Sequence, residues 1–192
     1  AASRDDLVAK AQGWGQEMAD VGITMNLAPV ADLVDIPNPS DNGPIGKWER
    51  EYGHDVETVL DRATAFAQGM EAAGVIATYK HFPGLGRVTA NTDTASGVTD
   101  DVTARSEDPA VSVFADAIGK GAKVIMVSSA IYSLIDSSAP ALFSSVVVTD
   151  MLRGDLGFTG VVITDDVSAA DQVQDRTPAE RAVQAVRGGC DI

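Results

Sequence analysis

Apolar segments of strand length recur along the chain, and amphipathic segments of helix length lie between them. The apolar segments do not alternate with polar residues, which is typical of strands buried on both faces in parallel α/β sheets. We expect four strands and the start of a fifth, at Ile23–Pro29, Val75–Tyr79, Val124–Val127, Val161–Ile163 and Gly189–Ile192. We expect helices at Asp5–Val21, Asp55–Ala73, Asp108–Lys120 and Phe143–Leu156, and a last one that begins at Thr177.

The ends of the expected helices carry capping signals. The stretch from Thr177 to Glu180 combines a capping box with a proline at the first helical position, which predicts a helix start there. Glycines at the carboxyl ends predict left-handed caps at Gly22, Gly74, Gly121, Gly157 and Gly188. These signals indicate a series of βα units.

Polar residues follow each apolar segment, and their positions help to choose between two parallel architectures. An open doubly wound sheet and a (β/α)8 barrel both consist of βα units. No Gly-x-Gly-x-x-Gly turn follows a strand, which argues against a dinucleotide site. In a barrel the carboxyl ends of all strands meet at one mouth, where active sites lie. The sequence therefore favours a TIM-type barrel, with these residues at its mouth: Asp32, Lys80, His81, Ser128, Ser129, Thr164, Asp165 and Asp166.

Charge and cysteine content exclude several classes of function. The formal net charge is −14, whereas binding of nucleic acid or anionic membranes needs clustered Lys and Arg. No apolar run is long enough to span a membrane. Cys190 is the only cysteine, which excludes an internal disulfide, and we expect it to be a small core residue. The two histidines have no ligand-spaced partners, so the sequence predicts no metal site.

Asp165 and Asp166 follow three β-branched residues at the end of the fourth expected strand. A carboxylate at a strand end in a barrel mouth is a candidate nucleophile or general base. Aspartate is also a favoured N-cap residue. We therefore expect one of the two aspartates to be catalytic and the other to be structural.

Lys80 and His81 stand at the end of the second expected strand. In a regular strand their side chains would point to opposite faces, whereas at a frayed end both could reach the mouth. Lysine donates hydrogen bonds and histidine donates or accepts them, which suits a ligand rich in hydroxyl groups. The alternative is a surface lysine beside a core histidine.

A long loop from Val34 to Gly53 carries Trp48 and Arg50. Loops of this length are usually functional or disordered. Arg50 could bind a carboxylate or sugar hydroxyls through its planar guanidinium, and Trp48 could stack on a sugar ring. An exposed Trp-x-Arg also occurs by chance, so this pair alone is a weak signal.

Taken together, these stretches resemble the N-terminal barrel of family 3 glycoside hydrolases, and most of all its β-N-acetylhexosaminidase branch. The matching stretches fall in the family's order and cover most of the chain. They are "NLAPVAD" (26–32), "WEREYGHD" (48–55), "KHFPGLG" (80–86), "LRGDLGFTGVVITDD" (152–166) and "GGCDI" (188–192). The resemblance implies a retaining glycosidase that cleaves terminal β-linked sugars.

The resemblance also implies roles for individual residues. Asp165 falls at the position of the nucleophile, which would form a covalent glycosyl-enzyme intermediate. Arg50, Lys80 and His81 fall where the family holds sugar hydroxyls. The implied partner is a carbohydrate, first a β-N-acetylglucosaminide of peptidoglycan or a chitin-type glycan, with a β-glucoside as the alternative. No metal and no organic cofactor is implied.

The chain departs from that branch in the loop after the glycines. The branch has Asp-Ser-His there, with the histidine as acid/base, whereas this chain has Asn91, Thr92 and Asp93. Asp93 could be the acid/base if burial or a nearby carboxylate raises its pKa, with Asn91 as a hydrogen-bonding partner. Alternatively, a residue outside the segment supplies the proton, or the protein binds a glycan without efficient hydrolysis. Other departures from the family pattern are Leu85, Ala130 and Ala169.

The resemblance further implies that residues 1–192 form part of one barrel domain, truncated at both ends, from about strand 3 to strand 7. The family's Asp-x-x-Gly-Gly segment is missing from this sequence. A bacterial envelope or secreted lipoprotein and a cytoplasmic bacterial protein both fit the family, and the envelope is slightly favoured. The oligomeric state stays open.

Overall fold

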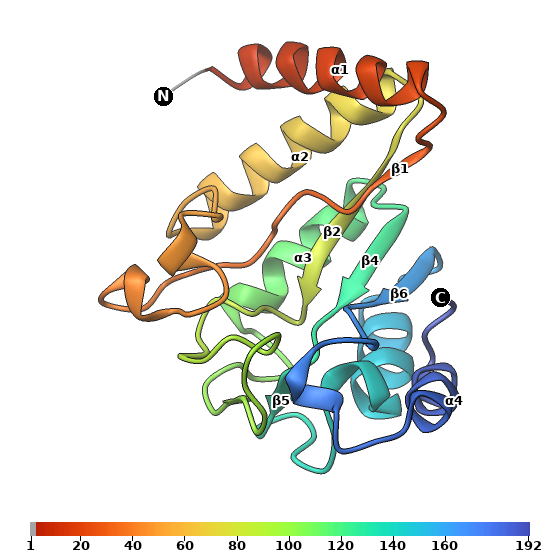
Figure 1. Cartoon of the computed structure of the whole chain (residues 1–192). Helices are drawn as coiled ribbons and strands as arrows, with labels where there is room; N and C mark the ends of the chain where they lie inside the picture. Colours follow the sequence, from red (N-terminus) through yellow and green to blue (C-terminus); the bar gives the residue numbers. More distant parts are fainter. Residues whose placement is uncertain (1–2) are drawn as a thin grey trace.

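Four parallel strands form the main sheet, in the order β1-β2-β4-β6 (Figure 1). The computed structural model describes residues 3–192. The strands of this sheet are β1 (Met25–Asn26), β2 (Ile76–Phe82), β4 (Val124–Val127) and β6 (Val161–Thr164). A separate parallel pair joins β3 (Thr99–Asp100) to β5 (Ile131–Tyr132). The sheet therefore contains the four strands that the apolar segments predict.

Helical segments connect successive strands of the sheet. The α-helices are α1 (Arg4–Asp20), α2 (Val56–Ala72), α3 (Pro109–Gly119) and α4 (Pro178–Gly188). Short 3-10 turns are η1 (Pro39–Asp41), η2 (Gly46–Trp48), η3 (Ala141–Phe143) and η5 (Asp171–Val173), and η4 (Val146–Asp155) is a π-helix. Figure 1 shows α1 beside α2, and α3 against the strand β2.

The order of the strands identifies the architecture. Neighbouring strands of the main sheet also follow one another along the chain, with α2, α3 or η4 between them. A doubly wound sheet would reverse its strand order at a switch point, and this sheet has no reversal. The chain has the fold of an incomplete segment of a (β/α)8 barrel, which confirms the predicted fold class.

Apolar side chains cover both faces of the sheet, as the continuous apolar segments predict. Ile125, Val127 and Val162 join the main core. On the opposite face, Val124, Met126 and Ile163 form a second buried cluster with Met25 packed against it. Because successive residues of a strand point to opposite faces, both faces need apolar side chains, and the alternating pattern of a half-exposed sheet is absent.

The helix ends agree with most of the predicted caps. The Thr177 side chain and Glu180 form the predicted capping box at the start of α4. The backbone φ angle is positive at Gly22, Gly74, Gly121 and Gly157, as expected. The prediction for Gly188 was wrong, because α4 includes Gly188 and the left-handed cap is Gly189, with φ 117°.

Two other predictions need correction. The segment Phe143–Leu156 forms a π-helix after a 3-10 turn, and its apolar spacing did not distinguish this winding from an α-helix. Residues 189–192 form no strand in the structure. The chain there nevertheless runs beside β6, since the Asp191 amide donates to the Val162 carbonyl at 2.8 Å and the Thr164 amide donates to the Ile192 carbonyl at 2.9 Å. Cys190 is buried, as predicted.

Candidate functional site

A cavity of about 280 Å³ lies at the carboxyl ends of β2 and β6. Its lining includes all five residues that the sequence singled out as site residues: Arg50, Lys80, His81, Asp93 and Asp165. The remaining lining residues are Pro44, Leu85, Asn91, Thr92 and Asp166. Residues separated by more than a hundred positions in the chain therefore meet at one mouth, where a (β/α)8 barrel carries its active site.

The end of β2 brings Lys80 and His81 to the same side. The pairing with β4 shifts its register between Lys80 and Phe82. Such an irregularity re-aims side chains that would otherwise alternate. Both side chains consequently line the cavity, with Lys80 half-buried and His81 buried.

Asp32 orients His81 from the loop after β1. Its carboxylate is fully buried and accepts from the His81 backbone amide at 2.9 Å and from the Leu85 amide at 2.7 Å. The His81 ring Nδ1 lies 2.7 Å from Asp32 Oδ2. Burial alone would raise the pKa of Asp32, but attraction to His81 and these hydrogen bonds outweigh it and lower the pKa. With Nδ1 engaged, Nε2 is the ring nitrogen left for a ligand.

Replacing Asp32 by asparagine is expected to lower the free energy of unfolding by about 3 kcal/mol at neutral pH, because it breaks a buried pair. Since the folded-state pKa of Asp32 is lowered, its contribution is fully present above the ordinary carboxyl pKa of about 3.9. It is lost as the pH falls through the folded-state pKa. Urea unfolding of the intact protein at neutral and acid pH measures both values.

The matched control for this variant is Glu17→Gln, which removes the charge of an exposed side chain on α1. It should change stability by only a few tenths of a kcal/mol, about the usual effect of a surface substitution. A loss from Asp32→Asn that is as large in acid as at neutral pH would contradict the assigned charge.

The two aspartates after β6 have different surroundings. Asp165 is half-buried, and its backbone amide donates to the Val127 carbonyl of β4 at 3.1 Å. Asp166 Oδ1 accepts from the Ser168 hydroxyl and amide and from the Ala169 amide, and these bonds, the Ser168 hydroxyl first, lower its pKa. Asp166 thus closes a turn, not the start of a helix. Asp165 Oδ1 accepts one hydrogen bond, from the Asp166 amide at 2.9 Å, and Asp165 is the candidate for covalent chemistry.

Arg181 of α4 fastens the same turn. Its side chain is 5% exposed, and Nη1 donates to the carbonyls of Val167 and Ser168 at 2.6 and 2.9 Å. The capping box that begins α4 therefore helps to position Arg181, which holds the turn that follows Asp166.

The loop of residues 84–93 carries Asp93 and packs closely against the segment after β1. A Cβ atom on Gly86 would lie 1.9 Å from the Leu33 carbonyl oxygen, so only glycine fits there. Asn42 Nδ2 donates to the carbonyls of Leu85 and Val88 at 2.9 and 2.8 Å. The Tyr132 hydroxyl donates to the Gly84 carbonyl at 2.9 Å. The front half of the loop is thus held from two other segments.

Asp93 lies at the rim of the cavity and is exposed to solvent. Partial burial, followed by the charge of Asp165, raises its pKa, and His81 and Arg50 counteract this in part. Asn91 contacts Asp93 differently from expectation, because its side-chain oxygen accepts from the Asp93 backbone amide at 2.9 Å and not from the carboxyl group. A carboxyl group with a raised pKa near a second carboxylate is suited to donate a proton.

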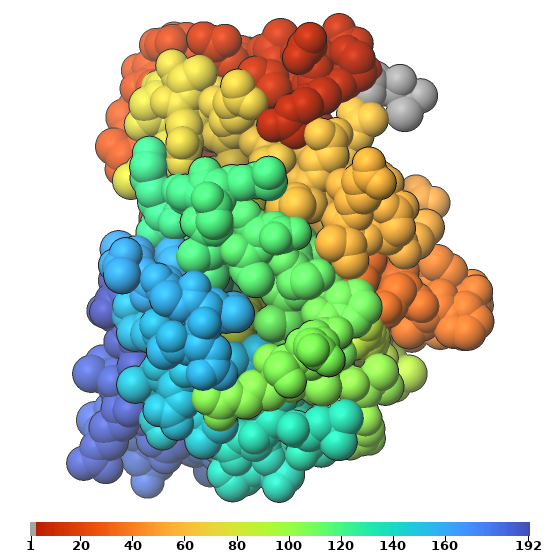
Figure 2. Space-filling view, turned by 180° about the vertical axis from the view of Figure 1, so that it is seen from behind, coloured from red at the N-terminus to blue at the C-terminus, as the bar shows by residue number. Residues whose placement is uncertain are grey.

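The cationic side of the cavity consists of Lys80 and Arg50. Burial, followed by the Arg50 charge, lowers the pKa of Lys80, and Asp165, Asp32 and Asp93 oppose this shift. Arg50 donates to the Pro44 carbonyl at 2.7 Å and is exposed at the rim. Its loop, orange in Figure 2, projects from one side of the molecule. Trp48 does not line the cavity but is 64% exposed with Lys47 over its ring, which does not fit a sugar-stacking role here.

Sequence reasoning missed Asn42, Tyr132 and Arg181, which hold the site loops without lining the cavity. Asn42 precedes a glycine, which signals a turn but gives no indication of its contacts with Leu85 and Val88. Among residues 3–192, no group of three or more His, Cys, Asp or Glu side chains is placed to hold a metal ion. In the same part of the chain, every helix is too short or too polar to cross a bilayer.

Comparisons with known proteins agree on one family. Residues 1–192 match the model of the glycosyl hydrolase family 3 N-terminal domain. A β-hexosaminidase of Psychromonas ingrahamii is 35% identical over 188 residues, which are 96% of this chain and 53% of that protein. The chain therefore spans about half the length of the curated relatives it matches.

Solved structures give the same likeness in three dimensions. The β-N-acetylhexosaminidase of Beutenbergia cavernae superposes with a TM-score of 0.97 at 54% identity, over 100% of this chain and 56% of that one. A β-N-acetylglucosaminidase of Paenibacillus sp. superposes with a TM-score of 0.88 at 32% identity, over 99% of this chain and 35% of that one.

Proposed function

Because the chain belongs to the N-terminal domain family of the family 3 glycosyl hydrolases, we propose that it carries the active site of a retaining glycosidase. The proposed substrates are terminal β-linked sugars, with N-acetylglucosaminides preferred. The observation that carries the proposal is the cavity that brings Asp165, Asp93 and three candidate sugar-binding residues together. The names of the similar proteins support the choice of sugar. The match over residues 1–192 supports one domain.

In the first step, a carboxylate oxygen of Asp165 attacks the anomeric carbon of the terminal sugar. The bond from that carbon to the glycosidic oxygen breaks, and its electron pair moves to this oxygen. The Asp93 carboxyl group donates its proton to the departing oxygen, which leaves as an alcohol. The raised pKa of Asp93 favours the protonated form that this step needs. The product is a glycosyl ester of Asp165.

In the second step, water attacks the same carbon and the ester bond to Asp165 breaks. Asp93, now a carboxylate, takes a proton from the water, which restores both side chains to their starting states. Two inversions give net retention of the β configuration.

Lys80, His81 and Arg50 would hold the sugar during both steps. Lys80 and Arg50 offer donors only, and His81 offers its Nε2, because Asp32 engages Nδ1. These three side chains can donate hydrogen bonds to the hydroxyl and carbonyl oxygens of the substituents on the sugar ring. Asp32 binds the His81 ring at Nδ1 and also accepts from the His81 and Leu85 amides. The His81 ring is therefore oriented before the ligand arrives, which reduces the conformational entropy lost on binding.

The test uses 5-fluoroglycosyl fluorides of the N-acetylglucosamine and glucose types with the intact protein, because fluorine at C5 leaves in place the C2 substituent that distinguishes the two sugars. Intact mass reports a covalent adduct, and peptide mapping locates it. We expect an adduct on Asp165 with the N-acetylglucosamine-type probe. Labelling by the glucose-type probe alone would change the substrate to a β-glucoside. The absence of any adduct, together with measurable glycan binding, would replace the proposed hydrolase with a carbohydrate-binding protein.

A further inference from the structure

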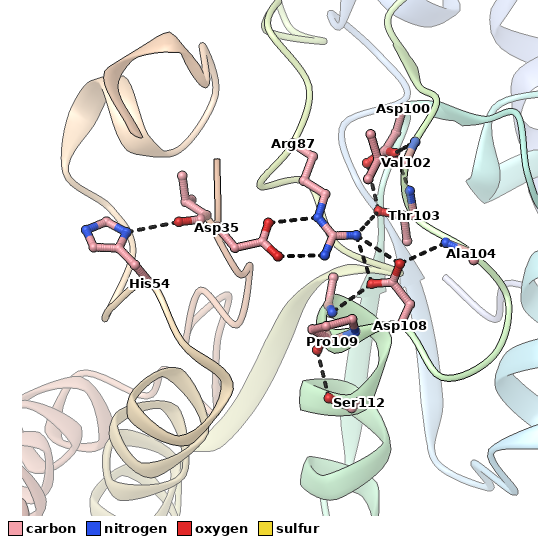
Figure 3. Close-up of polar contacts among 12 residues, drawn as sticks. Asp35, His54, Arg87, Asp100, Val102, Thr103, Ala104, Asp108, Pro109 and Ser112 are labelled. Atoms are coloured by element: carbon pink, nitrogen blue, oxygen red, sulfur yellow. Dashed lines mark hydrogen bonds and ion pairs between the residues drawn. The ribbon is translucent and has the colours of Figure 1, made fainter. Parts of the chain in front are cut away.

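Arg87 belongs to the loop that carries Asp93 but does not line the cavity (Figure 3). Its Nε and Nη2 donate to the two carboxylate oxygens of Asp35 at 2.8 and 2.7 Å. Its Nη1 donates to both carboxylate oxygens of Asp108 at 2.8 and 2.9 Å and to the Thr103 hydroxyl at 3.2 Å. The Arg87 side chain is 7% exposed. Arg87 thus binds two segments that are distant from each other in the sequence, one at Asp35 and one from Thr103 to Asp108.

The partners of Arg87 on one side belong to the rigid part of the fold. Asp108 is the N-cap of α3, and its carboxylate also accepts from the amides of Ala110 and Ala104 at 2.9 and 3.0 Å. The Thr103 hydroxyl donates to Asp100 at the end of β3. Figure 3 shows this group gathered on one side of the guanidinium. Because Asp108 and Thr103 each make further hydrogen bonds, the Arg87 guanidinium is bound on this side to groups that are themselves held in place.

The partner on the other side, Asp35, does not line the cavity but belongs to the loop that contributes Pro44 and Arg50 to its lining. Asp35 lies in the loop that also carries Arg50, and it is 29% exposed. The hydrogen bonds from Arg87, followed by its charge, keep the pKa of Asp35 below the ordinary value, although burial opposes this. A guanidinium that binds a carboxylate through two parallel hydrogen bonds fixes orientation as well as distance. Arg87 therefore links the loop of Asp93 to the loop of Arg50.

We propose that Arg87 is a positioning residue that sets where Asp93 lies relative to Asp165 and Arg50 across the cavity. The inference rests on the proposed function. Acid/base catalysis needs the donor within hydrogen-bond reach of the glycosidic oxygen, and a displacement of about 1 Å can lower the rate about 100-fold. Asn42 and Tyr132 hold only backbone atoms of residues 84–88, and amides of η5 hold the carbonyls of Thr92 and Asp93. The link through Arg87 adds a charged side-chain constraint that ties this loop to the loop of Arg50.

Replacing Arg87 by glutamine is expected to lower kcat about 10- to 100-fold, with a smaller change in KM. The alkaline limb of the pH–rate profile should also move to lower pH. Its position depends on Asp93, whose raised pKa stems from partial burial and Asp165, and both weaken if the loop moves away. The other charged or titratable groups near Asp93 are Asp166, His81, Lys80, Arg50 and Asp171. Of these, only Arg50 belongs to a loop that Arg87 binds.

The control is Arg105→Gln, which breaks another arginine–aspartate pair, to Asp155, on the surface. It should leave kcat and the alkaline limb unchanged. Arg87→Lys keeps the charge without the fork and should restore part of kcat. If Arg87→Gln does not fold, Asp35→Asn provides the test, because it breaks only the Asp35 side of the link. This variant should show the same shift of the alkaline limb to lower pH.

The outcomes separate this inference from the proposed function. An intact wild-type protein without hydrolytic activity would overturn the proposed function. An active wild type, with folded Arg87→Gln or Asp35→Asn variants that keep both its kcat and its alkaline limb, would overturn the positioning role alone. A lower melting temperature with unchanged kinetics would likewise reduce Arg87 to a structural role.

Discussion

Replacing Asp165 by asparagine is expected to lower kcat for an aryl β-N-acetylglucosaminide by about 10⁴-fold or more, as loss of a nucleophile does in other covalent enzymes. The asparagine amide keeps the size of the side chain but cannot form the glycosyl ester. The Asp165 amide donates to Val127, and the substitution leaves this backbone contact unchanged. Steady-state kinetics of the intact protein, with melting temperature as the folding control, measure the effect.

Asp166→Asn is the matched control, since it removes the neighbouring carboxylate. Asp166 accepts three hydrogen bonds within a turn, so its replacement should affect stability more than chemistry. Each hydrogen bond to a charged group of this kind contributes about 1 kcal/mol or more to the free energy of unfolding. If Asp166→Asn abolished turnover while Asp165→Asn retained it, the roles of the two aspartates would have to be exchanged.

Replacing Asp93 by asparagine is expected to lower kcat by about 10²- to 10⁴-fold, the usual contribution of a general acid/base. The loss should be smaller for nitrophenyl glycosides than for alkyl glycosides, because a nitrophenolate leaves without a proton. The raised pKa of Asp93 predicts an alkaline limb in the pH–rate profile, where the acid loses its proton. This limb should disappear in the variant. Rate profiles over pH with both leaving groups provide the check.

Asp171→Asn serves as the control for Asp93. Asp171 lies in η5 beside the same loop, and its backbone amide donates to the Asp93 carbonyl at 3.2 Å, a contact that the substitution keeps. Its kinetics should match those of the wild type. If Asp93→Asn showed equal losses for both leaving groups and kept its alkaline limb, Asp93 would not be the acid/base and another residue would have to supply the proton.

The sequence predicted the parts of the site that depend on strand ends. Lys80, His81 and Asp165 each follow an apolar run, and parallel strands bring such positions together whatever lies between them. Their meeting in one cavity follows from this topology. Their chemical roles come from the resemblance and from the proposed function, not from the spacing.

Contacts between loops could not be predicted in this way. Asn42 and Arg87 are polar residues in irregular segments, and no periodicity connects them to the partners described above, which lie 16 to 52 positions away. The 52-residue separation of Arg87 and Asp35 and the 43-residue separation of Asn42 and Leu85 illustrate this. Apolar spacing also failed at η4, because three-to-four spacing does not separate a π-helix from an α-helix. The order of strands and helices can thus be predicted from the sequence more readily than the hydrogen bonds that hold the loops.

The proposed nucleophile and the proposed proton donor are held in different ways. Asp165 extends directly from a strand of the sheet, whereas the segment of Asp93 is held by amides of η5, through the Thr92 and Asp93 carbonyls. Such bonds do not depend on the identity of residue 93. An evolving lineage can therefore exchange its proton donor in one substitution, aspartate for histidine or the reverse, without rebuilding the scaffold. Divergence among relatives should accumulate at position 93 before it reaches position 165.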